Sequence, residues 1–267
     1  MTIPMQWALR RRMMMAVLGI DVAALSITYT GAYTDYGMVT MSDGARDRLL
    51  AFTSSGTLSI GRPVNCEVCV VGGGANGYTG GPGGAGAYMK NQVIEAFEGG
   101  AVVVGAGQGV SSIVDVSVNA VSGKNGGTGA GGNPAGTGDG LSKYPFEDTS
   151  YSLWAGKPHC AGGGQGAYEY ETSQKGYTGG NGGTNGSNGY PWESSQMSNP
   201  SGGVGGSYGG GAGGNGTTVN GGNATYYGSG AGGGACREND NGIIHPYGGG
   251  SGYQGIVYIR IPEDQAA

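Results

Sequence analysis

Glycine is the feature that most restricts what this chain can fold into. It supplies 64 of the 267 residues, and 57 of these glycines lie between residues 72 and 252. Gly loses more backbone freedom on folding than any other residue, so such a region either stays flexible or orders through contacts of the backbone itself. With three Phe and three Trp in the chain, a conventional core is small.

The charge content favours order over a flexible Gly/Ser linker, which is the alternative reading of such a region. Charged residues make up 12% of the chain, whereas disordered chains combine low hydrophobicity with high net charge. The chain also contains 17 Tyr, and β-branched runs interrupt the glycine tracts. We therefore expect the glycine region to be folded.

The spacing of the glycines indicates what that fold is. Gly recurs at every third position within residues 80–86, 123–132 and 180–189. A period of three matches the polyproline-II helix, which has no internal hydrogen bonds, so its N–H and C=O groups need partners on neighbouring segments. The collagen triple helix fits poorly because the registers break often and Pro totals ten. An antiparallel bundle of glycine-rich polyproline-II-type helices within one chain fits better.

Composition divides the chain into four parts. We expect residues 1–24 to form an N-terminal docking segment with a short helix, and residues 25–71 a β base. We expect residues 72–252 to form the glycine-rich domain, with strands near 101–118, and residues 253–267 a closing strand and tail. Strand-like runs separated by turn residues occur at 25–30, 37–41, 48–53, 57–60 and 65–71. The predicted fold class is mainly β with irregular structure: a small antiparallel β base that carries the polyproline-II-type bundle.

Two cofactor motifs are by-products of composition. Residues 72–77 satisfy G-x-G-x-x-G after a strand, and residues 105–109 resemble the start of a flavoprotein. Both sites need a helix whose N-terminus receives a pyrophosphate, and the stretch after residue 77 is too rich in Gly and Pro to form one.

Cys66 and Cys69 form a C-x-x-C without a second pair and point to opposite faces of a strand. We expect no enzyme, no cofactor and no metal.

Aromatic stretches punctuate the glycine tracts and suggest binding. Tyr, Trp, Ser, Asn and Gly are favoured in recognition surfaces, and aromatic faces beside hydroxyl and amide groups suit saccharides. The alternative is that these rings pack over the glycine helices as a thin core. The residues predicted to bind a receptor are Tyr151, Trp154, Tyr168, Tyr170, Tyr190 and Trp192.

The N-terminal segment is predicted to dock to a partner protein through Trp7, Arg10, Arg11 and Arg12. An export signal is the alternative, but the apolar run after the arginines ends at Asp21 and is far shorter than the ~20 residues of a membrane span. A net charge of −5 gives no basic footprint for nucleic acid.

Several of these stretches, in this order, resemble the glycine-rich domain of bacteriophage tail proteins. The resemblance spans residues 48–261 and rests on the segments 52–58, 67–74, 102–107, 248–252 and 255–260. Residues 8–15 also look like the opening of small tail-associated proteins in phages of Gram-positive bacteria. The resemblance implies a virion component in which stacked polyglycine helices present loops to a host receptor, and it carries over no binding residues.

The leading hypothesis is therefore a tail-fibre or tail-tip protein, assembled in the host cytoplasm, that displays aromatic loops for receptor binding. Its expected partners are other virion proteins, further copies of itself, for instance as a trimer, and a host surface saccharide or protein. A purely architectural virion decoration or filament subunit is the runner-up, and a secreted matrix protein is a third class.

Overall fold

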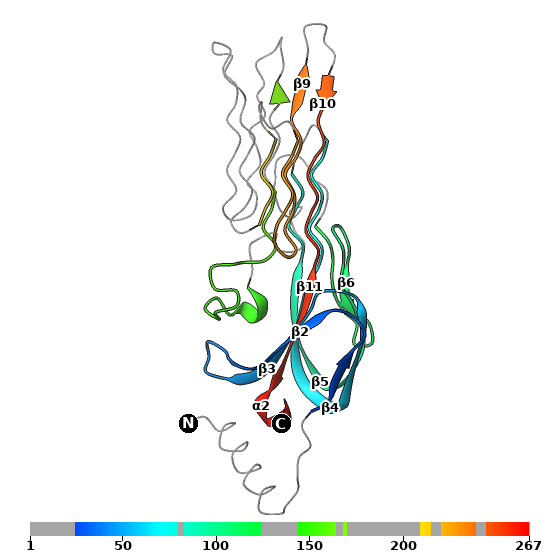
Figure 1. Cartoon of the computed structure of the whole chain (residues 1–267), viewed down its shortest axis with the longest axis vertical. Helices are drawn as coiled ribbons and strands as arrows, with labels where there is room; N and C mark the ends of the chain where they lie inside the picture. The colour runs from blue at the N-terminus through cyan, green and yellow to red at the C-terminus, as the bar shows by residue number, and fades with distance from the viewer. Residues whose placement is uncertain are drawn as a thin grey trace, which may run out of the picture.

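The computed structural model describes residues 25–79, 83–123, 144–163, 168–169, 209–214, 220–238 and 244–266. These residues form an elongated molecule, in which a β-sheet base at one end carries extended glycine-rich segments that run side by side away from it (Figure 1). The predicted N-terminal helix within residues 1–24 lies outside the described residues.

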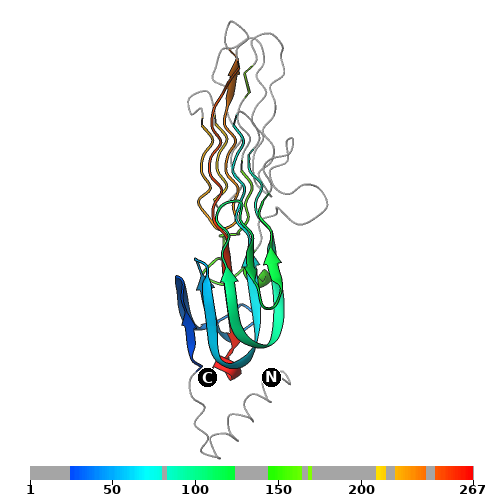
Figure 2. The same cartoon turned by 90° about the vertical axis from the view of Figure 1, so that its right-hand side faces the viewer.

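The base is an antiparallel sheet, so the prediction of a mainly β fold is confirmed. Its order is β2-β3-β11-β4-β5-β6-β7, and β1 pairs with β4. The hairpins on the β4 to β7 side of this sheet face the viewer in Figure 2. The strands are β1 (Ile27–Tyr29), β2 (Tyr33–Thr40), β3 (Arg46–Phe52), β4 (Gly56–Val71), β5 (Met89–Val103), β6 (Ser111–Ile113), β7 (Val118–Ala120) and β11 (Ile256–Pro262), and α2 (Glu263–Ala266) comes directly after β11.

The predicted closing strand returns to the sheet and lies at its centre. β11 pairs with β3 on one side and with β4 on the other, so Tyr258 stands opposite Ala51 and Cys69. The strand is buried because apolar residues occupy both faces, as in strands covered on two sides. The last described part of the chain is thereby tied into the base.

Alternation along the strands divides the core into two layers. Leu50, Phe52 and Val68 belong to one cluster of buried side chains, whereas Leu49 and Cys69 belong to the other. Successive side chains of a strand point to opposite faces of the sheet, which explains the division. Cys66 and Cys69 accordingly lie in different clusters, as the spacing predicted.

The boundary of the base differs from the sequence prediction in one respect. β5 begins at Met89, inside the region predicted to be glycine-rich, and pairs with β4 over most of its length. The start of this strand is not recognisable in the sequence, because the glycine-rich residues 83–86 lead into β5 without a turn signal between them.

The glycine segments are joined laterally by backbone hydrogen bonds. Three consecutive N–H groups, those of Gly73, Gly74 and Ala75, donate to three different segments, at Gly109, Tyr253 and Ala85 respectively. Three residues after Gly74, Gly77 donates to Gly250, in the same segment as Tyr253. The N–H groups of residues 74 and 77, three positions apart, therefore donate to the same neighbouring segment.

Residues 228–235 lie at the centre of this arrangement. Backbone hydrogen bonds join them to six segments: 72–79, 83–88, 160–163, 209–214, 220–225 and 247–255. We call these seven segments together the glycine bundle. Neighbours run in both directions: 247–255 is antiparallel to the central segment, but 72–79 is parallel to it, so the expectation of a purely antiparallel bundle is wrong.

Close approach of backbones explains why Gly is needed in the bundle. A Cβ atom added at Gly77 would lie less than 3.0 Å from the carbonyl oxygen of Gly232, and one added at Gly232 would meet the carbonyl of Ala212 equally closely. Such distances are not found for real Cβ atoms. The glycines therefore set the spacing between segments.

A small second sheet lies at the end of the bundle away from the base (Figure 1). β9 (Cys236–Glu238) pairs antiparallel with β10 (Ile244–Pro246) and parallel with β8 (Tyr168–Glu169). We call this the distal end. Across the described residues, no helix has the length and apolar character needed to cross a membrane.

Candidate functional site

Aromatic rings gather where the glycine bundle meets the base. They come from three parts of the chain: the loop around η1 (Pro145–Glu147), the segment before residue 228, and the end of the bundle with β11. We define the junction cluster as Tyr151, Trp154, His159, Tyr226, Tyr227, Tyr253 and Tyr258.

The rings of the junction cluster form a continuous chain of contacts. From Tyr253 the centroid distances are 5.5 Å to Tyr227 and from there 5.4 Å to Tyr226, which lies 4.8 Å from His159. The chain continues from His159 to Tyr258 at 5.7 Å, and then through Trp154 to Tyr151 at 5.4 and 4.8 Å. Edge-to-face and tilted pairs at these separations are stabilising beyond the area they bury. The cluster joins the bundle to β11.

His159 is the buried centre of the cluster. Its Nε2 lies 3.0 Å from the Tyr258 hydroxyl, and its Nδ1 has no hydrogen-bond partner among the described residues. Burial lowers the pKa of His159 to about 3 and raises that of Tyr258 well above 10. Both side chains are neutral at pH 7, so their contact is a hydrogen bond between uncharged groups.

Asp148 fixes the loop that carries Tyr151 and Trp154. Its carboxylate accepts the backbone N–H groups of Ser42, Ser150 and Tyr151 at 2.9, 3.1 and 3.0 Å. These hydrogen bonds outweigh the effect of burial and lower the pKa of Asp148. Trp154 Nε1 donates to the Asp148 carbonyl at 2.6 Å. The loop is thus tied both to itself and to the turn after β2.

The structure corrects the prediction for Trp154 as a receptor contact. Its side chain is completely buried, between Phe146, Tyr151 and Tyr258. The alternative, that aromatic residues pack as a core, therefore holds at this position. Tyr151 is half-buried and lies at the edge of the same cluster.

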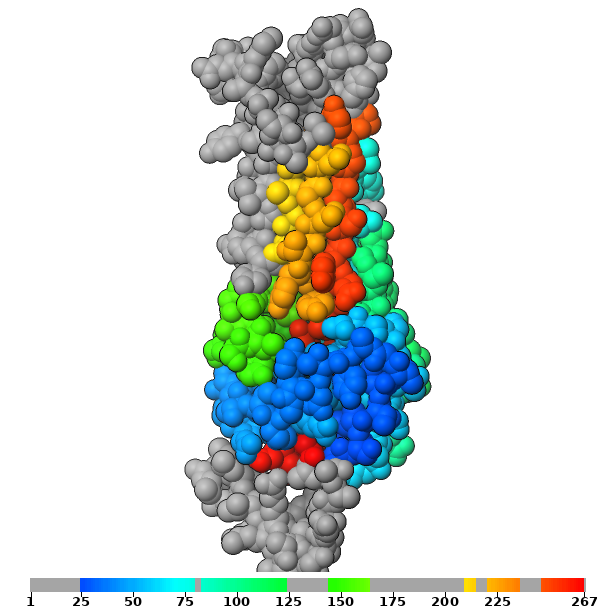
Figure 3. Space-filling view, in the orientation of Figure 1, coloured from blue at the N-terminus to red at the C-terminus, as the bar shows by residue number. Residues whose placement is uncertain are grey.

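β2, the loop at 144–163 and the bundle segments meet on one face of the molecule (Figure 3). Tyr253 is 37% exposed, and Tyr36, on β2, is 41% exposed. Burial raises the pKa values of Tyr151 and Tyr227, and the phenol of Tyr253 adds to the effect at Tyr227. Sequence reasoning missed Tyr36 and Tyr253, because neither belongs to an aromatic stretch.

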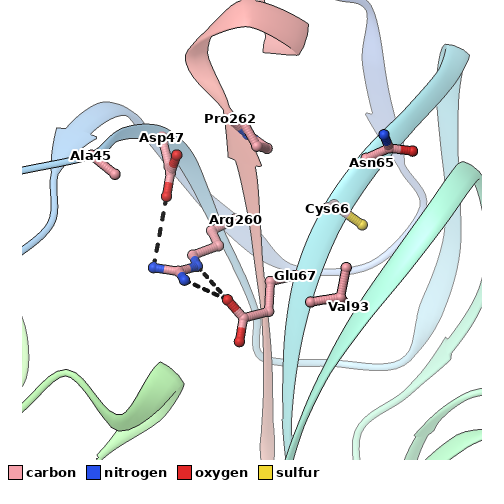
Figure 4. A pocket seen from close by; sticks show the side chains of 8 residues that line it. All are labelled: Ala45, Asp47, Asn65, Cys66, Glu67, Val93, Arg260 and Pro262. Carbon is pink, nitrogen blue, oxygen red and sulfur yellow. Dashed lines mark hydrogen bonds and ion pairs between the residues drawn. The ribbon is translucent and has the colours of Figure 1, made fainter. Parts of the chain in front are cut away.

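A second candidate site lies in the base, around Arg260 of β11. A hollow of about 330 Å³ is lined by Ala45, Asp47, Asn65, Cys66, Glu67, Val93, Arg260 and Pro262 (Figure 4). The guanidinium Nε of Arg260 donates to Glu67 at 2.7 Å, and Arg260 also pairs with Asp47 at 3.8 Å. Burial raises the pKa of Asp47, although Arg260 opposes this. The charged side chains that line the hollow are thus already paired with one another. The part of the chain that the structure describes contains no cluster of potential metal ligands.

The remaining predicted site residues are placed only in part. The backbone of Tyr168 lies in β8, at the distal end. Tyr170, Tyr190 and Trp192 fall outside the described residues, as do Trp7 and Arg10, Arg11 and Arg12.

No protein-family model matches this chain, and no curated protein matches it.

Proposed function

We propose that this chain is a structural protein of a phage tail fibre or tail tip that holds receptor-binding loops away from the virion. The observation that carries the proposal is the glycine bundle, whose segments are held to one another by backbone hydrogen bonds along their length. Such an array suits a rigid spacer. It would be an unusual way to build an enzyme site, because glycine offers no reactive side chain.

The segments of the bundle are best explained as polyproline-II-type helices. A helix with three residues per turn directs successive N–H groups to three sides and returns to the same side after three residues. The donors Gly73, Gly74 and Ala75, with Gly77 repeating the direction of Gly74, agree with this rule. Because every third position faces a neighbour closely, the conformation also accounts for the glycine period.

The two ends of the molecule suit two different partners. The base carries both the first described residue, Leu25, and α2, and Leu25 lies next in sequence to the segment with the predicted docking residues Trp7 and Arg10–Arg12. β8 and β9 lie at the distal end, and the aromatic residues Tyr170, Tyr190 and Trp192 come between these two strands in the sequence. We propose that the base docks to other virion proteins, within a homo-oligomer such as a trimer, and that these aromatic residues contact a host saccharide or protein.

Binding to cells tests this proposal. Fluorescently labelled protein is incubated with a panel of Gram-positive and Gram-negative bacteria, and bound fluorescence is compared with that of a Tyr190→Ala/Trp192→Ala variant. Tyr78→Ala serves as the control, because Tyr78 is an exposed tyrosine of the bundle itself.

The proposal predicts that the protein binds at least one strain, that the double variant loses most of this binding, and that the control keeps it. Binding that is absent from every strain, or equal in the double variant, contradicts it. Absent binding favours the architectural alternative of a decoration or filament subunit.

A further inference from the structure

We propose that the hollow around Arg260 holds the N-terminal segment of the same chain, residues 1–24. In this arrangement Trp7 lies against the apolar side of the hollow, and Arg10 or Arg11 lies against its carboxylates. The inference concerns contacts within one chain, so it does not depend on what the protein binds at its distal end. It rests on the shape of one face of the sheet, on the charge of that face and on where the described chain begins.

The residues that line the hollow share one face of the sheet. Arg260 of β11 stands opposite Glu67 of β4, and Glu67 stands opposite Val93 of β5. In the next row, Pro262 of β11 stands opposite Asp47 of β3. Residues directly opposite each other in neighbouring strands carry their side chains on the same face. Figure 4 shows the Arg260 side chain between those of Asp47 and Glu67. Four strands thus contribute to one surface.

The loop at 144–163 covers this face only as far as Arg260. The Phe146 ring of that loop has the guanidinium 5.0 Å from its centroid. Further along the same row, Val93 is 69% exposed, which makes it the most exposed large apolar side chain among the described residues. The hollow therefore presents an apolar surface that the described part of the chain leaves open.

The carboxylates of the hollow outnumber its cations. Glu67 and Asp47 share the single guanidinium of Arg260. Both close contacts of that guanidinium with Glu67 go to the same oxygen, Oε2. The Asp47 side chain is buried, but it meets the guanidinium only at 3.8 Å, which is beyond hydrogen-bond distance. One negative charge is left in excess, so a second cation would be stabilised there.

The described chain begins close to the hollow. The carbonyl oxygen of Leu25 accepts a hydrogen bond from Arg48 Nη1 at 3.0 Å, and Arg48 follows Asp47 directly in β3. These two β3 side chains point to opposite faces, so the segment has to pass around the end of the strand. Arg11 lies 14 residues before Leu25, which allows a reach of about 20 Å as a helix and about 45 Å when extended.

The N-terminal segment supplies groups that complement the hollow. Residues 1–24 contain three Arg and a single acidic residue, Asp21. Trp7, Arg10 and Arg11 are spaced by three and four positions, so they share one face of the helix that the sequence predicts. An aromatic ring beside guanidinium groups matches a surface that is apolar on one side and acidic on the other. Tethering gives the chain's own segment a high effective concentration, which favours it over the segment of a second copy.

Site-specific photo-crosslinking in the full-length protein tests the inference. Val93 is replaced by p-benzoylphenylalanine, because this exposed position lines the hollow. The control carries the same photoreactive residue in place of Val114, which is 52% exposed, lies between β6 and β7 and does not line the hollow. Crosslinked peptides are identified by mass spectrometry in an equal mixture of ¹⁵N-labelled and unlabelled protein, which separates crosslinks within one chain from those between copies.

The inference predicts that position 93 crosslinks to residues 1–24 of the same isotopic form, and that position 114 does not reach this segment. Arg10→Glu/Arg11→Glu is expected to lower the yield about fivefold or more, because repulsion from the carboxylates replaces attraction. Arg10→Lys/Arg11→Lys keeps the charge and is expected to keep most of the yield. Circular dichroism checks that each variant retains the β-sheet of the base.

Four results would overturn the inference. They are no crosslink from position 93 to residues 1–24, the same yield to that segment from positions 93 and 114, an unchanged yield in the glutamate variant, and crosslinks only between the two isotopic forms. The last result would assign the hollow to the segment of a second copy. None of them bears on cell binding by Tyr190 and Trp192, so the proposed function stands or falls separately.

Discussion

The α-carbon of Gly77 faces the carbonyl oxygen of Gly232 so closely that no side chain fits between them. The two residues belong to the parallel segments 72–79 and 228–235, which are joined by hydrogen bonds from Ala231 to Ala75 and from Gly234 to Tyr78. A methyl group at position 77 would have to separate two backbones that are held together on both sides of it.

Gly77→Ala is therefore expected to destabilise the protein by about 1–3 kcal/mol, the usual cost of overpacking. Gly248→Ala is the matched control, because the nearest atom to a Cβ there is the Asn220 Oδ1 at 3.7 Å. This control is expected to be neutral or slightly stabilising, since alanine restricts the unfolded chain. Urea unfolding of the two variants measures the difference, and equal midpoints would show that the segments are not packed this closely.

Trp154→Ala tests the role of the buried ring. Removing a fully buried Trp is expected to cost about 3–5 kcal/mol, and Trp154→Phe much less. Thermal unfolding provides the measurement. A Trp154→Ala protein as stable as wild type would contradict the burial of this side chain and favour a surface contact instead.

His159 is expected to make stability depend on pH. Its pKa in the folded protein, about 3, lies below the ordinary value of 6.5, so the unfolded state takes up a proton first as the pH falls. The contribution of neutral His159 is complete above pH 6.5 and is lost progressively between 6.5 and about 3. The slope approaches about 1.4 kcal/mol per pH unit.

His159→Gln removes this titration while keeping a side chain that can bond to Tyr258. Unfolding free energies at pH 7.5 and pH 5 are expected to differ more in wild type than in the variant. Asp148, whose pKa is lowered from 3.8, contributes its own loss only at lower pH. The same pH dependence in both proteins would assign the effect to other groups.

The thiols of Cys66 and Cys69 are expected to be unreactive in the folded protein. Both are buried, and burial raises the pKa of Cys66 to about 12 and that of Cys69 still further. Because the thiolate is the reacting species, labelling with iodoacetamide should be slow until urea unfolds the chain. Peptide mapping by mass spectrometry gives the rate at each site, and rapid labelling of Cys69 in native protein would refute its position at the centre of the sheet.

Most strands of the base were predictable from runs of β-branched and apolar residues between turn signals. β11 shows this best, since its apolar run indicated the closing strand that returns to the sheet. The segment neighbours in the bundle were not predictable. One glycine tract looks like another, so nothing in residues 72–79 indicates that 228–235 lies beside them.

The packing of the junction cluster was not predictable from the sequence either. Tyr151 and Trp154 stand three residues apart in one aromatic stretch, yet one is half-buried and the other completely buried. That difference depends on β11, which brings Tyr258 against Trp154 from more than 100 residues away in sequence. Local composition carries no information about such a contact.

Amide hydrogen exchange across the glycine bundle tests the central claim most directly. The N–H groups of residues such as Ala75, Ala231 and Gly232 donate to neighbouring segments, so they are expected to exchange as slowly as those of β4. Tyr78→Ala, which changes only an exposed side chain, should leave this protection intact. Exchange of these amides at the rate of an unstructured peptide, while β4 remains protected, would show that the glycine region is a flexible linker and contradict the account.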